Sequence, residues 1–303
     1  MRFTVIFIFY FFLQSAFANP VIFPTDSVKN TKSKKIILSI GSGAAITGSL
    51  IYLNQAWYKQ YSNGNFHFFD DNKEWLQMDK VGHIFSTYQV GRGMIQSMKW
   101  AGFTKNQSIF IGGTSGLAYM TAIEIMDGFS SGWGFSLGDM GANFAGSAIV
   151  ISQQYFWDEQ RIALKYSFHQ TSFPQYRPNL LGANLSEQIL KDYNGQTYWL
   201  SGNISAFLKK ENKFPKCLNI AFGYSTCGMI SGSDNYVFIG SDGSVIGNNR
   251  YRKFLVSLDV DFTRIKTKSR FLKSVFSVIN CIKVPFPAIE ISRAKLSGHL
   301  LYL

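Results

Sequence analysis

Three pairs of polar side chains interrupt the apolar helical stretches of this sequence. The pairs are Asp79 with His83, Glu124 with Asp127, and Asp139 with Asn143. Residues three or four positions apart lie on the same face of a helix, so each pair projects from one side of its helix. Charged groups in apolar helices are costly and usually face the interior of a bundle, where they serve a site.

The residue types in these pairs suit two kinds of chemistry. Carboxylates with one imidazole are ligands for a divalent metal, and unequal burial of two carboxyl groups separates a general acid from a general base. The end of one antiparallel helix lies beside the start of the next, so we expect the second and third pairs to meet. The candidate catalytic residues are Glu124, Asp127, His83 and Asp139, and the candidate ligand-binding residues are Asn143 and Asp79.

A purely architectural role for the same residues stays open. Asp79 and Asp139 stand at predicted helix starts, where an aspartate side chain caps free backbone amides. Asp127 precedes Gly128, which is a natural helix stop. A closed polar network that fixes helix register is a further alternative. The residues that capping does not explain are His83, Glu124 and Asn143.

Four helical segments are expected to position these residues. They are residues 36–53, 81–100, 106–123 and 140–157. The first, third and fourth are eighteen uncharged residues long, the lower limit for a helix that spans a bilayer. Small residues recur four apart in them, as in Gly112 with Gly116, which lets helix backbones touch. The pattern predicts a compact bundle.

The second half of the chain has the period of two that is typical of β-strands. Apolar residues alternate with small or polar ones in residues 218–225 and 254–263, so each is predicted as a strand with one buried face. Expected partners are residues 198–207, 288–292 and 296–303, with a loop and one short hairpin in 228–249 and an amphipathic helix over 271–282. Five or six strands are too few for a closed outer-membrane barrel.

The predicted fold class is therefore α+β. An N-terminal bundle of about four short apolar helices is followed by a small antiparallel β-sheet with a covering helix. The expected organisation is a signal peptide (1–18), a basic segment (19–35), a helical bundle domain (36–169), a linker (170–191) and a β-rich domain (192–303).

The first eighteen residues have the features of an export signal. Arg2 precedes an uncharged apolar run over residues 3–13, and Ala16-Phe17-Ala18 is a small-x-small cleavage site, which predicts a mature start at Asn19. The three cysteines are Cys217, Cys227 and Cys281, so acylation of a new N-terminal cysteine is not expected. Export permits a disulfide between Cys217 and Cys227, but their use as small apolar residues explains them equally well.

The composition favours membrane lipid as a partner over nucleic acid. The 303 residues are 46% hydrophobic and 16% charged, against about one quarter charged in average soluble domains, and the formal net charge is +12. The basic residues are scattered and no nucleic-acid motif accompanies them. The first uncharged stretch is preceded by four lysines: Lys29, Lys32, Lys34 and Lys35. In a chain with a cleaved signal this end lies outside the membrane, so the lysines violate the positive-inside rule. We therefore expect helices that lie in or on a membrane from the exported side; soluble core helices are the alternative.

Two runs also carry a family resemblance. WLQMDKVGH from Trp75 to His83 and DGFSSGWGFSLGDMGAN from Asp127 to Asn143, with Tyr88 and Glu124 between them, resemble the YfiM-like family of predicted periplasmic lipoproteins. Its larger bacterial envelope members are similar over much of the chain, including KDYNGQTYWLS from residue 191. VanZ-like membrane proteins are more distantly similar. Their helices carry a comparable order of motifs: Asp-Lys-x-x-His, then Glu, then Asp with Asn four residues later. This chain departs from the lipoprotein pattern because it lacks the acylated cysteine.

The resemblance implies a location in the cell envelope and no established reaction. It adds Tyr88 to the candidate ligand-binding residues, and we expect a protein on the periplasmic side, membrane-associated, at the outer membrane rather than the inner. The first functional hypothesis is a membrane-associated binding or structural module, whose polar cluster orders the bundle or holds a lipid headgroup. The alternative is a membrane-associated hydrolase of a lipid-linked or envelope substrate that uses the cluster with a divalent metal or a water.

Overall fold

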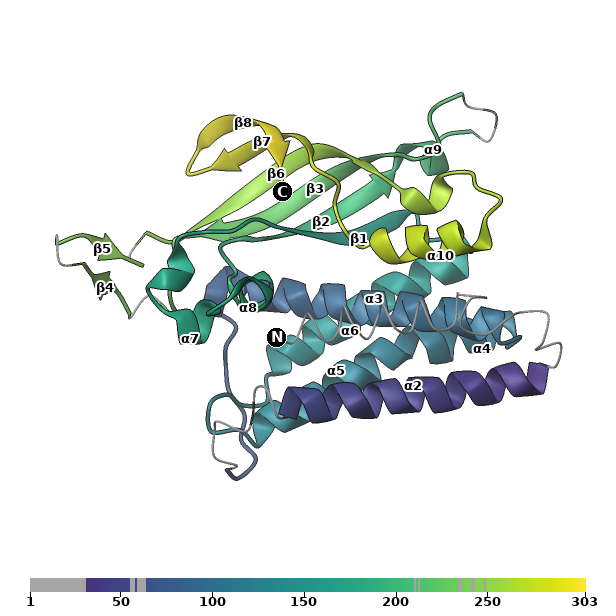
Figure 1. Ribbon diagram of the computed structural model, residues 1–303, viewed down its shortest axis with the longest axis horizontal. Coiled ribbons are helices and arrows are strands. Elements are labelled where there is room, and N and C mark those ends of the chain that lie inside the picture. Colours follow the sequence, from purple (N-terminus) through teal and green to yellow (C-terminus); the bar gives the residue numbers. More distant parts are fainter. Residues whose placement is uncertain are drawn as a thin grey trace.

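A layer of long helices lies beneath a curled β-sheet in the computed structural model of this protein (Figure 1). The structure describes residues 31–54, 58, 64–209, 211, 213–233, 236–240, 243–247 and 249–303. The predicted signal peptide, its cleavage site and Lys29 lie outside the described residues. The prediction of a mixed helix and sheet protein with an antiparallel sheet is confirmed.

The four expected helical segments all contain helix. The long helices are α2 (Thr31–Leu53), α3 (Met78–Trp100), α5 (Gly113–Gly128) and α6 (Leu137–Phe156). The third segment is less regular than expected, because α4 (Lys105–Gln107) and a π-helical turn (Ser108–Gly112) precede α5. Short helices α7 (Pro178–Leu181), α8 (Leu185–Lys191) and α9 (Ile204–Phe207) follow, the first two of them in the expected linker. The count of about four helices is thus only partly matched.

Glycines bring α5 and α6 into backbone contact with α3. A Cβ added at Gly116 would lie 2.2 Å from the carbonyl oxygen of Thr87, and one at Gly146 would lie 2.4 Å from that of Ile84. The close packing expected from small residues four apart is therefore present around α3. It is absent at Gly48 of α2, where an added Cβ would meet no atom within 4 Å.

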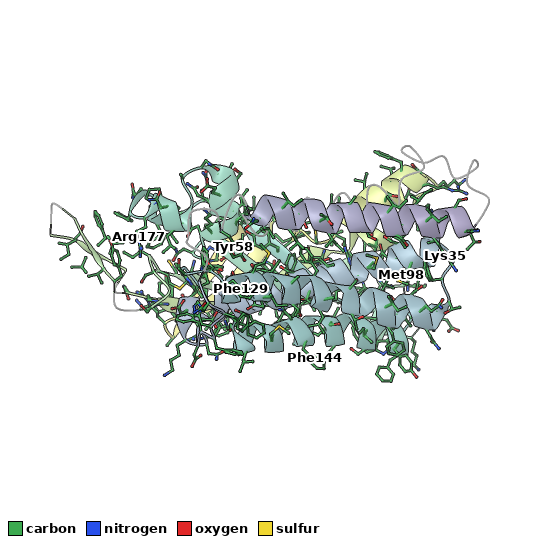
Figure 2. The ribbon with its side chains drawn as sticks, turned by 90° about the horizontal axis from the view of Figure 1, so that it is seen from below. Lys35, Tyr58, Met98, Phe129, Phe144 and Arg177 are labelled. Atoms are coloured by element: carbon green, nitrogen blue, oxygen red, sulfur yellow. The ribbon has the colours of Figure 1, made fainter. Side chains whose placement is uncertain are left out.

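Helix α2 lies on the outside of the bundle, along α3 and α5 (Figure 2). At one end its Lys34 and Lys35 ammonium groups stand over the rings of Trp100 and Phe103, at 5.5 and 4.5 Å from the ring centroids. Two helical stretches, Thr31–Ile51 and Lys105–Gly128, are long and apolar enough to cross a membrane, and 11% and 44% of their most apolar windows are buried. In the first of these, Ile36, Ile40 and Ile51 are exposed.

The sheet is six-stranded and antiparallel, in the order β1-β2-β3-β6-β7-β8. Its strands are β1 (Ile162–Phe168), β2 (Gln196–Asn203), β3 (Leu218–Cys227), β6 (Tyr251–Val260), β7 (Phe286–Ser292) and β8 (Lys295–Tyr302). The short hairpin expected within residues 228–249 is β4 (Phe238–Ile239) with β5 (Val245–Ile246). Strand β1 was not expected, because residues 162–168 fall in the segment predicted as helical bundle.

The chain closes one end of the sheet on itself. After α10 (Arg270–Ile279), residues 281–283 pair with the free edge of β1: the backbone amide of Tyr166 donates to Cys281 at 2.8 Å, and that of Lys283 donates to Tyr166 at 2.9 Å. From there the chain enters β7, which lies between β6 and the opposite edge strand β8. Figure 1 shows β7 and β8 curling over the top of the sheet, away from the helices.

The helix expected over residues 271–282 forms as α10, but it lies at one end of the sheet beside α3 (Figure 1). Its Ser277 carbonyl accepts a hydrogen bond from Arg92 of α3 at 2.8 Å. Cys217 and Cys227 are free thiols. Cys217 immediately precedes the ten-residue strand β3 and Cys227 ends it, so at 3.3 Å per residue the two lie about 30 Å apart. The possible disulfide between them is therefore not formed.

Strands β3 and β6 have one buried face, as expected, but it is the polar one. In β3 the buried residues include Asn219, Ala221 and Ser225, whereas Ile220 and Phe222 are exposed. Strand β6 repeats this arrangement with buried Lys253, Ser257 and Asp259 and exposed Phe254 and Leu258. Part of the apolar face is covered by α3, where Phe85 packs against Tyr166 of β1 and Tyr198 of β2.

Candidate functional site

A small cavity of about 120 Å³ lies between the first turns of α3 and α6, the end of α5 and the segment after α8. Its acidic lining residues are Asp71, Glu74, Asp79, Asp127 and Asp139, and its aromatic ones are Phe69, Trp75, Trp133 and Tyr193. His83 also lines it. All three predicted pairs of polar residues therefore lie at the same end of the bundle, and the cavity borders each helix that carries them.

A left-handed turn sets the start of α3. Trp75, Leu76 and Gln77 have positive φ angles of 48°, 50° and 65°, a conformation that costs a non-glycine residue about 1–2 kcal/mol. The turn is held from the β half of the chain: the Trp75 amide donates to Gly232 at 2.8 Å, and the Leu76 carbonyl accepts from the Tyr224 hydroxyl. This strained turn places Trp75 and the first turns of α3 at the cavity, as strained backbone often does at functional sites.

Asn143 fixes the tautomer of His83. The amide oxygen Oδ1 of Asn143 lies 3.0 Å from His83 Nδ1 and also accepts the Thr87 hydroxyl at 3.2 Å. An amide oxygen accepts hydrogen bonds and does not donate, so Nδ1 carries the hydrogen. In a neutral imidazole the lone pair is then on Nε2.

That Nε2 atom faces two carboxylates. It lies 3.8 Å from Asp79 Oδ2 and 3.8 Å from Asp139 Oδ1, and one ligand atom from each of Asp79, His83 and Asp139 falls within 4.8 Å of the other two. Asp79 is oriented by the Tyr193 hydroxyl, which donates to Oδ1 at 2.7 Å. A histidine whose second nitrogen donates to an oxygen, beside oriented carboxylates, is the usual arrangement around a protein-bound metal.

Glu124 and Asp127, the second predicted pair, have different positions at the site. Glu124 is buried, its Oε1 lies 3.6 Å from His83 Nδ1, and its Oε2 accepts the Ser136 amide at 3.3 Å. Asp127 lines the cavity and accepts the Tyr58 hydroxyl at 2.7 Å. The structure therefore joins Glu124 to the histidine, whereas Asp127 stands in the wall of the same cavity outside the group of three ligand atoms.

Lys80 supplies a positive charge beside this group. Its Nζ lies 2.6 Å from Asp71 Oδ1, 2.9 Å from Asp139 Oδ1 and 3.9 Å from Asp79 Oδ2. Burial opposes the charge on Lys80, but the carboxylates of Asp79 and Asp139 outweigh it and raise the pKa of this ammonium. Asp71 also accepts the Ser136 hydroxyl at 2.6 Å.

Burial also changes the acidity of the carboxyl groups. It raises the pKa of Asp139 to about 7, an effect that His83 opposes and the negative charge of Asp79 reinforces. At Glu74, burial and then the charges of Asp71 and Asp79 raise the pKa. A carboxyl group with a pKa near neutrality can exchange a proton at physiological pH.

The capping explanation does not account for Asp79 and Asp139. The N-cap of α6 is Ser136, whose hydroxyl oxygen accepts the Asp139 amide at 3.1 Å, and the Asp139 carboxylate instead pairs with Lys80. The N-cap of α3 is Gln77, without a side-chain hydrogen bond. Helix α5 does end at Gly128, as expected.

Tyr88 is not part of this cavity. It lies on the buried face of α3 toward the sheet, and its hydroxyl donates to the Ile162 carbonyl at 3.4 Å. Burial raises the pKa of its phenol. Tyr88 follows His83 by five residues and does not share its helix face, so it does not join the other candidate residues at the cavity.

The site also contains residues outside the predicted pairs, among them Asp71, Lys80, Ser136 and Tyr193. Lys80 stands inside the Asp-Lys-x-x-His run and Tyr193 inside the KDYNG run, so the motifs contained them without assigning a role. Ser136 belongs to a Gly-Phe-Ser repeat. Asp71 precedes the helix and has no periodic signal.

One family model matches a part of the chain that contains most of the site residues. Residues 66–154, less than a third of the chain, match the model of the DUF2279 family, and this stretch contains Asp71, Asp79, Lys80, His83, Glu124, Asp127, Ser136, Asp139 and Asn143. No curated protein and no solved structure matches the chain. The match names neither the YfiM-like nor the VanZ-like family, so those resemblances stay predictions. The matching family is described as a predicted periplasmic lipoprotein, which supports an exported protein of the cell envelope.

Proposed function

We propose that this envelope protein is a binding module that holds a divalent metal ion between Asp79, His83 and Asp139. The observation that carries the proposal is the orientation of His83. Its Nδ1 contacts Asn143, so Nε2 is the ring nitrogen that faces the two carboxylates that complete the group of three ligand atoms. A first-row ion such as Zn²⁺ or Mn²⁺ suits imidazole and carboxylate ligands.

The charges around the three ligand atoms fit a cation. Among the described residues of this cluster, the carboxyl groups of Asp71, Asp79, Glu124 and Asp139 outnumber the ammonium group of Lys80. The adjoining cavity leaves room for further ligands on one side. When bound, such an ion would polarise an oxygen of a ligand or acidify a bound water.

Metal-dependent hydrolysis of a lipid-linked or envelope substrate is the second candidate function. The observation that favours it is the position of Glu74, which lines the cavity outside the three proposed ligands and whose pKa burial raises above its ordinary value, as a proton-transfer group requires. Glu124 and Asp127 would then serve as buried partners of the site. Binding is the simpler proposal because it requires only the ligand geometry.

The location that we propose is the exported face of a membrane, preferentially the outer membrane. Exposed apolar side chains on α2 and α6 support association with lipid: Ile36 and Ile40 stand out from the first, and Phe144 and Phe156 from the second. Figure 2 shows Phe144 at the outer edge of the bundle.

Metal titration of metal-free, detergent-purified protein tests the proposal. Calorimetry with Zn²⁺, Mn²⁺ and Mg²⁺ should give one site per chain for at least one ion, and that ion should raise the Tm. His83→Gln should lose the site while remaining folded. The matched control is His299→Gln, because His299 pairs with Glu290 in the sheet, away from the cavity. A wild-type protein that binds none of the three ions, or an equal loss in both variants, would leave the polar network with a purely architectural role.

A further inference from the structure

The sheet presents a continuous apolar surface that no described part of the chain covers. Facing residues on adjacent strands form two rows: Phe254, Ile291 and Leu296, then Phe222, Val256 and Ile289. Phe222, Phe254 and Ile289 are 54%, 53% and 51% exposed, and Leu296 is 73% exposed. We call this surface, which spans β3, β6, β7 and β8, the outer sheet face.

The opposite face of the same strands is polar and internally satisfied. Lys165 and Asp259 are fully buried and form an ion pair at 2.8 Å, and Asp259 also accepts the Ser201 hydroxyl at 2.6 Å. Asn219 contacts both Asn203 and Ser201, at 2.7 and 2.8 Å. The sheet thus buries a charged pair and amides while it exposes phenylalanine and isoleucine, which is the reverse of a water-soluble sheet.

We infer that the outer sheet face lies against the acyl chains of a phospholipid bilayer. Strands in lipid alternate apolar outward and polar inward, and β3 and β6 have this alternation. A contiguous apolar surface across four strands is also larger than the scattered exposed residues of soluble proteins. The inference concerns the sheet and does not depend on a metal in the cavity.

Basic and aromatic groups mark one border of this surface. Arg252 lies opposite Thr226 at the end of the apolar rows, and its guanidinium donates to the Tyr224 hydroxyl at 3.1 Å. Arg293 follows β7 and stands over the Tyr251 ring, 3.8 Å from the centroid. Paired arginine and tyrosine side chains at the edge of an apolar face are typical of the headgroup region, where the arginines meet lipid phosphates. This complementarity favours anionic lipid over a protein partner.

Spin labels on the outer sheet face test the inference. The full chain would carry Cys217→Ser and Cys227→Ser, with the buried Cys281 retained, and single labels at Phe222→Cys or Ile289→Cys. The matched control is Gln170→Cys, an exposed polar position outside the sheet. Each protein is reconstituted in vesicles of phosphatidylethanolamine with phosphatidylglycerol, and collisions of the label with oxygen, which dissolves in lipid, are compared with those of a water-soluble nickel chelate.

We expect both sheet labels to collide several-fold more often with oxygen than with nickel, and the control label to show the reverse order. Two labelled positions are used so that a local structural disturbance at one of them does not decide the result. Circular dichroism of each labelled protein should match that of the unlabelled protein, which shows that the fold is retained. Nickel access at Phe222 and Ile289 equal to that at Gln170 would place the face in water and overturn the inference. Protection from both collision partners, with spin–spin broadening that grows with protein concentration, would assign the face to a second copy and would also overturn it.

Discussion

Asn143 and His83 are joined across the bundle, 3.0 Å apart, by a contact between the amide oxygen and Nδ1 of the imidazole. The contact links α6 to α3 and determines which ring nitrogen faces Asp79 and Asp139. Asn143 is therefore a positioning residue: it acts on the proposed ligand group through His83.

Removing the Asn143 amide should weaken metal binding while all three proposed ligands remain. We expect Asn143→Leu to lower the affinity roughly 10- to 100-fold, as other losses of an outer-shell partner do. It should also cost about 1–3 kcal/mol of unfolding free energy, because the hydrogen-bond donors of His83 and Thr87 lose their acceptor. Calorimetric titration and chemical unfolding measure the two effects. An unchanged affinity in a folded variant would contradict the role assigned to Asn143.

Removing the charge of Lys80 should have opposite effects on metal binding and on stability. Lys80→Met leaves Asp71 and Asp139 without their ion-pair partner, so we expect a loss on the order of 3 kcal/mol in the metal-free protein. The same change removes a competing cation, so the metal should bind more tightly and restore the Tm. A purely architectural network would lose stability that added Zn²⁺ or Mn²⁺ does not recover.

The raised pKa of Asp139 predicts a particular pH dependence of stability. Burial holds this pKa at about 7 in the folded protein, whereas an unfolded aspartate ionises near about 3.9. Because the folded state retains the proton more strongly, the contribution of Asp139 to stability is complete below about pH 4 and is lost as the pH rises through about 7. We expect Asp139→Asn to flatten the Tm profile of metal-free protein over this window. Asp158→Asn, at an exposed carboxylate, is the control and should not flatten it.

The close contact of α5 with α3 predicts that adding one methyl group at Gly116 destabilises the protein. Gly116→Ala would place a Cβ 2.2 Å from the Thr87 carbonyl oxygen, and we expect a loss of about 1–3 kcal/mol. Gly141→Ala on α6 is the matched control, because an added Cβ there meets no atom within 4 Å and alanine favours helix by up to about 1 kcal/mol. Thermal unfolding in one detergent compares them. Equal Tm values for the two variants would mean that the helices are not packed this closely.

Periodicity predicted most of the elements but not how the sheet is oriented. A period of two in β3 and β6 identifies strands, yet it does not say which face meets water, and here Phe222 and Phe254 are outside. Strand β1 carries the same alternation, with Leu164 and Tyr166 on one face, but it is short and directly follows the helical bundle, so the alternation alone does not distinguish it from the end of the bundle.

The spacing of polar residues along the helices predicted part of the site. Helical spacing found His83, Glu124, Asp139 and Asn143, since residues of one helix face must project together. Whether Asp79 and His83 join the other pairs depends on the packing of three helices. Tyr193 reaches Asp79 from a segment more than a hundred residues away along the chain, a contact that no local pattern contains.

Locating the ion itself tests the central claim most directly. Crystals of the full chain soaked with Mn²⁺ allow an anomalous difference map, in which manganese scatters and the lysine and carboxylates do not. We predict one strong peak in the space enclosed by Asp79, His83 and Asp139, and its absence from His83→Gln crystals. A wild-type map with well-ordered side chains and no peak at this position would contradict the proposed metal site.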